Sequence, residues 1–247
     1  MDKTNNKKAK PSPSKKTANR ISSSIKKLDP LIGGGFKRES IILVAGGTGC
    51  GKSILATQFL IDGIKNYNES GIYITFEERK KKVYESMLEF GWDLDKYEKE
   101  GKFVFLEYTP EQVKKILTEG GGIVENILEK MGAKRIVIDS ITSFALLYED
   151  ELTKKEASLA LFELIESWGC TALLTSQDIS PEEETIVAAT EFEVDGIILL
   201  YHLKRKGVRT RALEVLKMRG TKIPEKTFEL EITAKGIDIN PKKVMPF

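Results

Sequence analysis

Apolar residues along this chain fall into short dense runs that alternate with longer stretches of helical spacing. The runs cover residues 41–46, 72–76, 102–107, 135–139 and 171–176, and Val, Ile, Leu and aromatic side chains dominate them. Because these five runs are apolar on both faces, they predict buried parallel strands rather than half-exposed antiparallel ones. A sixth run at residues 196–202 predicts one more strand.

Helical periods lie between the runs, at residues 52–67, 79–90, 119–131 and 154–168. This alternation predicts an α/β fold, in which helices flank a mainly parallel twisted sheet. Residues 210–218, 226–232 and 236–239 then follow with short turns and no helix between them, which predicts antiparallel strands that extend one edge of the sheet. With no internal repeat, a single domain over residues 21–247 is the simplest organisation.

The composition excludes several classes of protein. The chain has 247 residues, of which 40% are hydrophobic, so it can bury a core and is not wholly disordered. No apolar run is long enough to span a bilayer, and the N-terminus lacks the apolar core of a signal peptide. Two cysteines, Cys50 and Cys170, make no disulfide framework, and the single histidine, His202, has no metal-ligand spacing. We therefore expect a reducing, cytoplasmic setting.

Charge is unevenly distributed along the chain. Residues 1–20 carry seven Lys or Arg against one acidic residue, Asp2, and they contain almost no apolar side chain. We expect a disordered basic tail there, with a nucleic-acid or partner-binding arm as the alternative. The rest of the chain holds 32 basic and 36 acidic residues, which argues against a broad nucleic-acid-binding face.

The most informative motif follows the first predicted strand and reads 46-GGTGCGKS-53. Glycines allow backbone angles that bring successive N–H groups onto phosphate oxygens, and the helix that begins near Lys52 points its positive end at the same anion. Lysine reaches the β- and γ-phosphates, and the serine hydroxyl binds Mg²⁺. The alternative is a purely structural glycine turn. The predicted nucleotide-binding residues are Gly47, Thr48, Gly49, Cys50, Gly51, Lys52 and Ser53.

A second acidic contact for Mg²⁺ is expected at the carboxyl end of another core strand. In 134-KRIVIDS-140 the strand ends at Asp139, where the ligands of such sheets bind. Asp139 and Ser53 are therefore the candidate metal ligands. The alternative is an aspartate that only caps the following helix.

Hydrolysis also needs a group that orients or deprotonates the attacking water. The pair Glu77 and Glu78 ends the strand that follows the phosphate-loop helix, in 74-ITFEER-79. We therefore name Glu77 and Glu78 as candidate catalytic residues. The alternative is that both complement the dipole of the next helix.

These elements, in this order and spacing, resemble the RecA-like ATPases and especially the KaiC family. The resemblance covers nearly all of residues 21–247, including 28-LDPLIGGGFKRES-40, 75-TFEE-78, 211-RALEVLKMRGT-221 and 230-LEITAKGIDINP-241. It implies a RecA-like core, ATP and Mg²⁺ as cofactors, Glu77 and Glu78 at the catalytic position, and a homo-oligomeric ring, expected to be a hexamer.

The same resemblance implies composite sites between subunits. In KaiC-like proteins the Lys-x-Arg-Gly-Thr hairpin reaches the nucleotide of the neighbouring subunit. Carried over, Lys217 and Arg219 would contact the γ-phosphate in trans, with Thr221 and the backbone of Met218 nearby, and would stabilise its charge. Without the resemblance, two solvated cations on an edge strand would be the simpler interpretation.

Some features depart from the family pattern. Glu39 stands where a glycine is usual, and Ile223 stands where relatives often have His, so a base or ribose contact is not expected there. The clock protein of the family has two such domains and a regulatory tail. We therefore expect neither circadian timekeeping nor autophosphorylation from this single domain.

Gln177 follows a core strand where RecA-like proteins place a phosphate sensor, and it completes the predicted site. Residues 178–193 after it carry six carboxylates, whereas a DNA-binding loop would be basic or glycine-rich. The favoured function is an ATP-hydrolysing, ring-forming ATPase with a regulatory or signalling role and an unidentified protein partner. The alternatives are a RecA- or RadA-type recombination or repair ATPase on single-stranded DNA, and an assembly protein that binds ATP but barely hydrolyses it.

Overall fold

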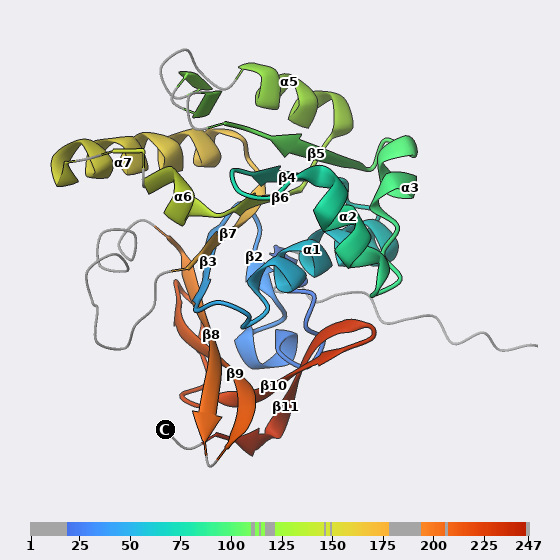
Figure 1. Cartoon of the computed structure of the whole chain (residues 1–247), viewed down its shortest axis with the longest axis vertical. Helices are drawn as coiled ribbons and strands as arrows, with labels where there is room; N and C mark the ends of the chain where they lie inside the picture. The colour runs from blue at the N-terminus through green and yellow to red at the C-terminus, as the bar shows by residue number, and fades with distance from the viewer. Residues whose placement is uncertain are drawn as a thin grey trace, which may run out of the picture.

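A computed structural model of the chain describes residues 19–109, 112–113, 115–116, 122–145, 147–148, 150–177, 194–205 and 207–245. Its main feature is a nine-stranded sheet with the strand order β11-β10-β9-β8-β3-β7-β6-β4-β5 (Figure 1). The strands are β3 Ile41–Gly46, β4 Gly71–Thr75, β5 Phe103–Glu107, β6 Arg135–Asp139, β7 Thr171–Ser176, β8 Gly196–Arg205, β9 Val208–Met218, β10 Phe228–Thr233 and β11 Gly236–Val244.

Strands β3 to β8 form the parallel part of the sheet, and β8 to β11 form the antiparallel part. β3 pairs in parallel with both β7 and β8, and β4 pairs in parallel with β5 and β6. The antiparallel pairs β8–β9, β9–β10 and β10–β11 extend one edge. The predicted α/β architecture with a C-terminal antiparallel extension is confirmed. β5 differs from the prediction of full burial, because it is an edge strand whose buried and partly exposed residues alternate.

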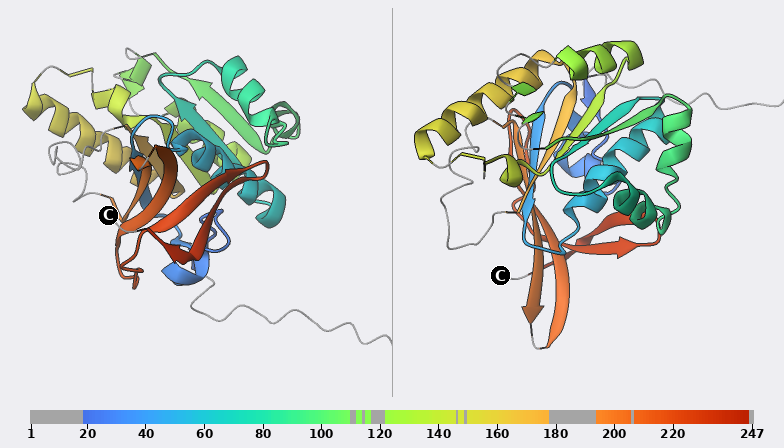
Figure 2. Two further views of the ribbon diagram at one scale, coloured as in Figure 1. Left: turned by 60° about the horizontal axis from the view of Figure 1, so that its bottom comes forward. Right: turned by 45° about the horizontal axis from the view of Figure 1, so that its top comes forward.

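Helices cover both faces of the parallel part (Figure 2). One face holds α1 Lys52–Asp62, α2 Lys80–Leu88 and α3 Leu94–Lys99, and the other holds α5 Gly122–Met131, α6 Ile141–Ala145 and α7 Glu151–Ser167. Successive strand residues supply opposite faces, so Ile42 packs with the α1 side while Leu43 packs with the α7 side. The helix predicted over 52–67 is α-helical only to Asp62, and a π-helical turn, η2 Gly63–Tyr67, completes it. The short helices α3 and α6 were not predicted.

The N-terminal segment forms a separate two-stranded sheet beside the core. β1 Arg20–Ile21 pairs antiparallel with β2 Phe36–Lys37, and a 3-10 turn, η1 Asp29–Ile32, lies between them. Residues 1–18 lie outside the described part, so the disordered tail stays a prediction. Arg20, which the charge pattern assigns to that tail, is in β1 and pairs with Lys37.

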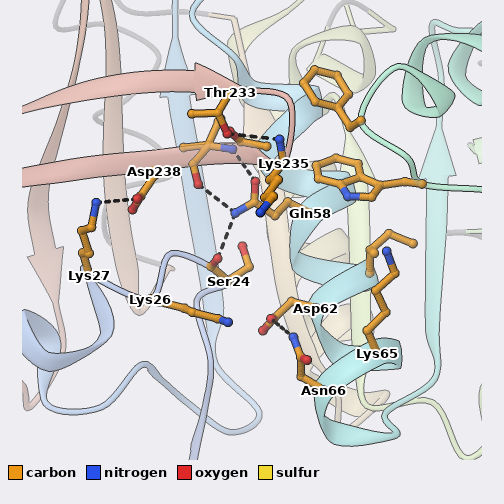
Figure 3. Close-up of a pocket in the computed structure, with 15 residues that line it drawn as sticks. Ser24, Lys26, Lys27, Gln58, Asp62, Lys65, Asn66, Thr233, Lys235 and Asp238 are labelled. Carbon is orange, nitrogen blue, oxygen red and sulfur yellow. Dashed lines mark hydrogen bonds and ion pairs between the residues drawn. The ribbon is translucent and has the colours of Figure 1, made fainter.

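One glutamine joins the N-terminal segment, α1 and the C-terminal hairpin. The Gln58 side chain donates from Nε2 to the carbonyls of Ser24 (2.9 Å) and Ile237 (3.0 Å), and its Oε1 accepts from the Ile237 N–H at 2.6 Å (Figure 3). Because Gln58 is buried, these bonds are shielded from water. They fix the antiparallel extension against the helix that begins at the glycine loop.

Candidate functional site

The glycine loop connects the carboxyl end of β3 to the first turn of α1, as the phosphate-binding pattern predicts. Gly49 and Gly51 have φ of 75° and 111°, which side-chain-bearing residues rarely adopt. A Cβ at Gly46 would clash with the carbonyl of Leu200 on β8. The backbone path of the loop therefore depends on glycine at these three positions.

Lys52 lies under this loop and is buried. Its Nζ donates to the carbonyls of Gly46 at 2.7 Å and Gly47 at 3.0 Å, and it lies 3.9 Å from the sulfur of Cys50. The ammonium group is thus held against the carbonyls of the glycine loop. Cys50 is also buried, and burial raises the pKa of its thiol.

Two residues of the antiparallel extension lie against the glycine loop, and no motif in the sequence pointed to either contact. Arg211 on β9 donates from Nε to the Gly49 carbonyl at 3.0 Å. His202 on β8 lies beside the same turn, where a side chain at Gly49 would come within 3.5 Å of its Nδ1. Burial and then the charges of Arg211 and Arg209 lower the pKa of His202, which favours a neutral imidazole near pH 7.

Asp139 ends β6 on the same edge of the sheet, and both of its oxygens accept hydrogen bonds from buried hydroxyls. Tyr73 on β4 donates to Oδ2 at 2.5 Å, and Thr175 on β7 donates to Oδ1. The Ser53 side chain interacts with the same Tyr73 hydroxyl, so Ser53, Tyr73 and Asp139 converge at one place. Burial, and then the Asp139 charge, raise the pKa of Tyr73 well above its usual value, so Tyr73 remains a donor.

Glu77 extends across the carboxyl edge of the sheet towards Gln177. Its Oε2 accepts from Nε2 of Gln177 at 2.9 Å. Its Oε1 accepts from the hydroxyls of Ser140, at 2.5 Å, and Ser143. The Gln177 backbone is fixed in turn, because its N–H donates to Thr142 Oγ1 at 2.8 Å. The structure thus brings together two residues that the sequence separates by 100 positions.

Glu78 points away from this group. Its Oε1 forms an ion pair with Lys82 at 3.3 Å, one turn along α2. Glu78 still lies near enough to the Tyr73 hydroxyl for its charge to contribute to the raised pKa of that tyrosine. The two adjacent glutamates therefore have different neighbours. Glu77 bonds to Gln177 and Ser140, whereas Glu78 pairs with Lys82 and lies near the Tyr73 hydroxyl.

The turn that carries Lys217, Met218, Arg219 and Thr221 lies at the opposite end of the sheet. β8 pairs Leu200 with Gly46 at the loop end of β3, and it pairs Gly196 with Ile42 at the other end. Met218 pairs with Gly196. The four residue steps from Ile42 to Gly46 span about 13 Å, so this turn is too far away to reach the loop of its own subunit.

Sequence reasoning missed Tyr73, Thr175, Ser140 and Ser143. Tyr73 had a detectable signal, since it is a hydroxyl-bearing aromatic in a strand that is buried throughout and it needs a polar partner there. Ser140 follows Asp139 directly. Thr175 and Ser143 are recognisable only when β7 and α6 are placed beside β6.

The arrangement fits a nucleotide with Mg²⁺. Glycine backbone, a buried lysine and a helix N-terminus suit phosphate, while Ser53 and Asp139 offer the oxygen ligands that Mg²⁺ prefers. Within the described part of the chain, no cluster of three His, Cys, Asp or Glu side chains could hold a metal ion. Mg²⁺ at this site would therefore depend on one carboxylate, one hydroxyl, water and the phosphates of the nucleotide, as in many ATPases.

Taken together, a parallel sheet with this loop, Asp139 and the antiparallel extension defines a P-loop ATPase domain of the RecA-like class. A family model for the KaiC ATPase matches residues 21–244. The chain belongs to the KaiC ATPase family.

Several known proteins are similar to this chain. The UPF0273 protein of Methanocaldococcus jannaschii is 34% identical, with 92% of this chain and 98% of the relative covered. The UPF0273 protein of Pyrococcus furiosus is also 34% identical, over 92% of this chain and 96% of its own length. A crystal structure of a KaiC-like protein from Pyrococcus horikoshii superposes with a TM-score of 0.80 at 35% identity, covering 90% of this chain and 99% of that one.

The residues that the structure describes include no helix long and apolar enough to cross a membrane. The acidic residues 178–193 that follow Gln177 lie outside the described part.

Proposed function

We propose that this protein hydrolyses ATP with Mg²⁺ at composite sites between the subunits of a ring, and that the ring has a regulatory or signalling role. One observation carries the proposal. The Lys52 loop, Asp139 and the Glu77–Gln177 pair lie at the carboxyl ends of the parallel strands. The turn with Lys217 and Arg219 lies at the opposite ends of these strands.

The loop and its lysine would bind the phosphates of the nucleotide. Lys52 is already fixed next to the loop carbonyls, so little side-chain entropy is lost when it turns to a phosphate. Ser53 and Asp139 would hold Mg²⁺, which neutralises the charge that develops on the β- and γ-phosphates. Tyr73 and Thr175 keep the Asp139 carboxylate oriented, as partners of metal-binding carboxylates commonly do.

Glu77 is the proposed general base. It would accept the proton of the water that attacks the γ-phosphorus, and the bond to the leaving ADP oxygen would break. Ser140, Ser143 and Gln177 hold its carboxylate in one orientation. Because Gln177 contacts Glu77 directly, its amide is suited to respond to loss of the γ-phosphate.

The second half of the site would come from a neighbouring subunit. The turn of Lys217 and Arg219 cannot reach the loop of its own chain, so a role at a nucleotide requires another copy. Each subunit would then offer its loop edge to one neighbour and this turn to the other. A head-to-tail contact whose rotation closes makes a ring, and we propose a hexamer.

Mass measurement of the assembly, together with phosphate release, tests this proposal. We expect ATP with Mg²⁺ to favour a hexamer, and the turnover per subunit to fall on dilution as the ring dissociates. EDTA should abolish turnover. Monomers that hydrolyse ATP at an undiminished rate per subunit would contradict composite sites, and assembled protein that releases no phosphate would contradict hydrolysis.

A further inference from the structure

Arg20 holds the turn of Arg219 and Thr221 in place. Its Nη2 donates to the Thr221 hydroxyl at 2.8 Å, across 201 positions of sequence. Its Nη1 donates to the carbonyls of Ile32 at 2.9 Å and Gly35 at 2.6 Å. One guanidinium group therefore links the turn at the end of β9 to the segment that precedes the first core strand.

Three consecutive glycines of that segment lie next to β1 or continue the chain beside it. Gly33, Gly34 and Gly35 have φ of 75°, 106° and 111°, all in the region that favours glycine. A Cβ at Gly33 would lie 3.4 Å from the Arg20 guanidinium, and one at Gly35 would clash with the backbone of Ile21. The glycine run thus allows a close approach to β1 and directs the Gly35 carbonyl at Arg20.

The turn is also held from its other side. The Arg219 N–H donates to the Asp195 carbonyl at 2.7 Å, and its guanidinium lies 3.7 Å from Asp195 Oδ1. Asp195 is itself tied to β3, because its Oδ2 accepts from the Ile41 N–H at 3.0 Å. The Thr221 N–H closes the turn on the Met218 carbonyl at 3.1 Å. Arg20 therefore provides the link on the side away from the main sheet.

We propose that Arg20 is a positioning residue for the site in the neighbouring subunit: by fixing Thr221 it holds Lys217 and Arg219 where they meet the phosphate of the neighbour's ATP. This inference rests on the proposed function. A planar guanidinium suits the task because it donates in several fixed directions at once, whereas a lysine ammonium on a flexible stem does not. Small displacements of a charged group at a reacting phosphate cost large factors in rate.

The first test compares Arg20→Ala and Arg20→Lys with Lys26→Ala. Lys26 is exposed on the same N-terminal segment, so its loss controls for the removal of one positive charge. At protein concentrations where mass measurement gives the assembled ring, we expect Arg20→Ala to lower kcat about tenfold, with ATP affinity almost unchanged. Arg20→Lys should be impaired as well, and Lys26→Ala should match the parent. Normal turnover in Arg20→Ala rings would overturn the proposal.

The second test asks in which subunit Arg20 acts. Arg20→Ala subunits are mixed with Glu77→Gln subunits under conditions that exchange subunits. We expect turnover above the mean of the two separate proteins, because an intact Glu77 site can then meet a neighbour with an intact Arg20. No gain would overturn the proposal.

A parallel mixture of Arg219→Ala with Glu77→Gln separates this inference from the proposed function. If that mixture gains activity and the Arg20→Ala mixture does not, the composite site stands and the role of Arg20 fails. If neither gains activity, the composite site itself is wrong.

A third variant keeps the test decisive if Arg20→Ala does not assemble. Thr221→Val removes the acceptor of the Arg20 bond and leaves β1 and the glycine segment unchanged. We expect Thr221→Val to lower kcat severalfold, and we expect Arg20→Lys to add little to this loss when both changes are combined. Normal turnover in Thr221→Val, or fully additive losses, would contradict the proposed link.

Discussion

The Tyr73 hydroxyl donates to Oδ2 of Asp139 at 2.5 Å, from the neighbouring strand of the sheet. Tyr73 is buried, and its ring stacks on Phe105 at a centroid distance of 5.1 Å. Its position is therefore fixed by packing, and its hydroxyl orients the carboxylate that we assign to Mg²⁺. Burial and the Asp139 charge raise the pKa of Tyr73, so this donor stays protonated through the whole range in which the enzyme would work.

Tyr73→Phe should weaken Mg²⁺ binding without unfolding the protein. The ring keeps its packing, but Asp139 retains only the Thr175 hydrogen bond. We expect the Mg²⁺ concentration for half-maximal ATP turnover to rise about tenfold, the scale typical of lost partners around metal ligands. Tyr84→Phe is the matched control, since it removes a hydroxyl that bonds Glu98 at 3.0 Å on the side of α2. Equal Mg²⁺ dependence in both variants would refute this role for Tyr73.

Lys52→Ala should abolish tight ATP binding. Lys52 is the buried cation of the loop, and its ammonium group is within 3.0 Å of two loop carbonyls. Lys65→Ala, which removes an exposed lysine from the turn after the same helix, should bind normally. Equilibrium binding of a fluorescent ATP analogue with Mg²⁺ measures the affinity of both variants. Unchanged affinity in Lys52→Ala would rule out the loop as the nucleotide site.

Glu77→Gln should bind ATP normally and slow hydrolysis by about 10²-fold or more, as is usual when a general base is lost. Glu78→Gln should have a smaller effect, because the Glu78 carboxylate faces Lys82 rather than Gln177. Single-turnover phosphate release measures the hydrolysis rate of each variant. A larger loss in Glu78→Gln would reverse the assignment, and normal turnover in both would remove the pair from the mechanism.

Removal of residues 1–18 should leave thermal stability and turnover nearly unchanged, because these residues offer almost no apolar surface to bury. Removal of residues 1–20 should lower turnover, since it also deletes Arg20 and one residue pair of the β1–β2 sheet. The two truncations are compared by thermal denaturation and phosphate release in the assembled state. Equal turnover in both would show that Arg20 has no such role.

The sequence was sufficient for the sheet core and the glycine loop because both obey local rules. Runs that are apolar on both faces favour parallel strands covered on two faces, and 46-GGTGCGKS-53 has few physical purposes other than phosphate binding. The ends of the elements were less predictable. The helix over 52–67 changes its hydrogen bonding at Gly63, which packs against the Arg135 side chain of β6.

The contacts that complete the site are long-range, and no local pattern encodes them. Glu77 meets Gln177 and Ser140 only because β4, β6 and β7 are neighbours in the sheet. Arg20 looked like one more charge of a basic tail, since its acceptors lie at residues 32, 35 and 221. Composition therefore assigned Arg20 to the tail, whereas the structure places it in β1.

The clearest stability prediction concerns Arg135, which begins β6 with a fully buried charge. Its Nε donates to Glu69 Oε2 at 2.9 Å, and its Nη1 donates to the Phe59 carbonyl at 2.8 Å. The guanidinium also lies over the Phe59 ring, 4.6 Å from the centroid. It fills the space beside Gly63, where a Cβ would clash with it, so the glycine lets the helix end pass over the arginine.

Glu69→Gln should therefore destabilise the protein strongly. It leaves the buried Arg135 charge without its countercharge, at a cost of about 3–5 kcal/mol in the free energy of unfolding. Glu85→Gln removes one partner of an exposed pair with Lys81 and should change that free energy by no more than about 0.5 kcal/mol. Because the penalty arises from the stranded charge, adding Arg135→Met to Glu69→Gln should recover part of the loss. Urea denaturation measures all three, and a double variant less stable than Glu69→Gln alone would contradict this account.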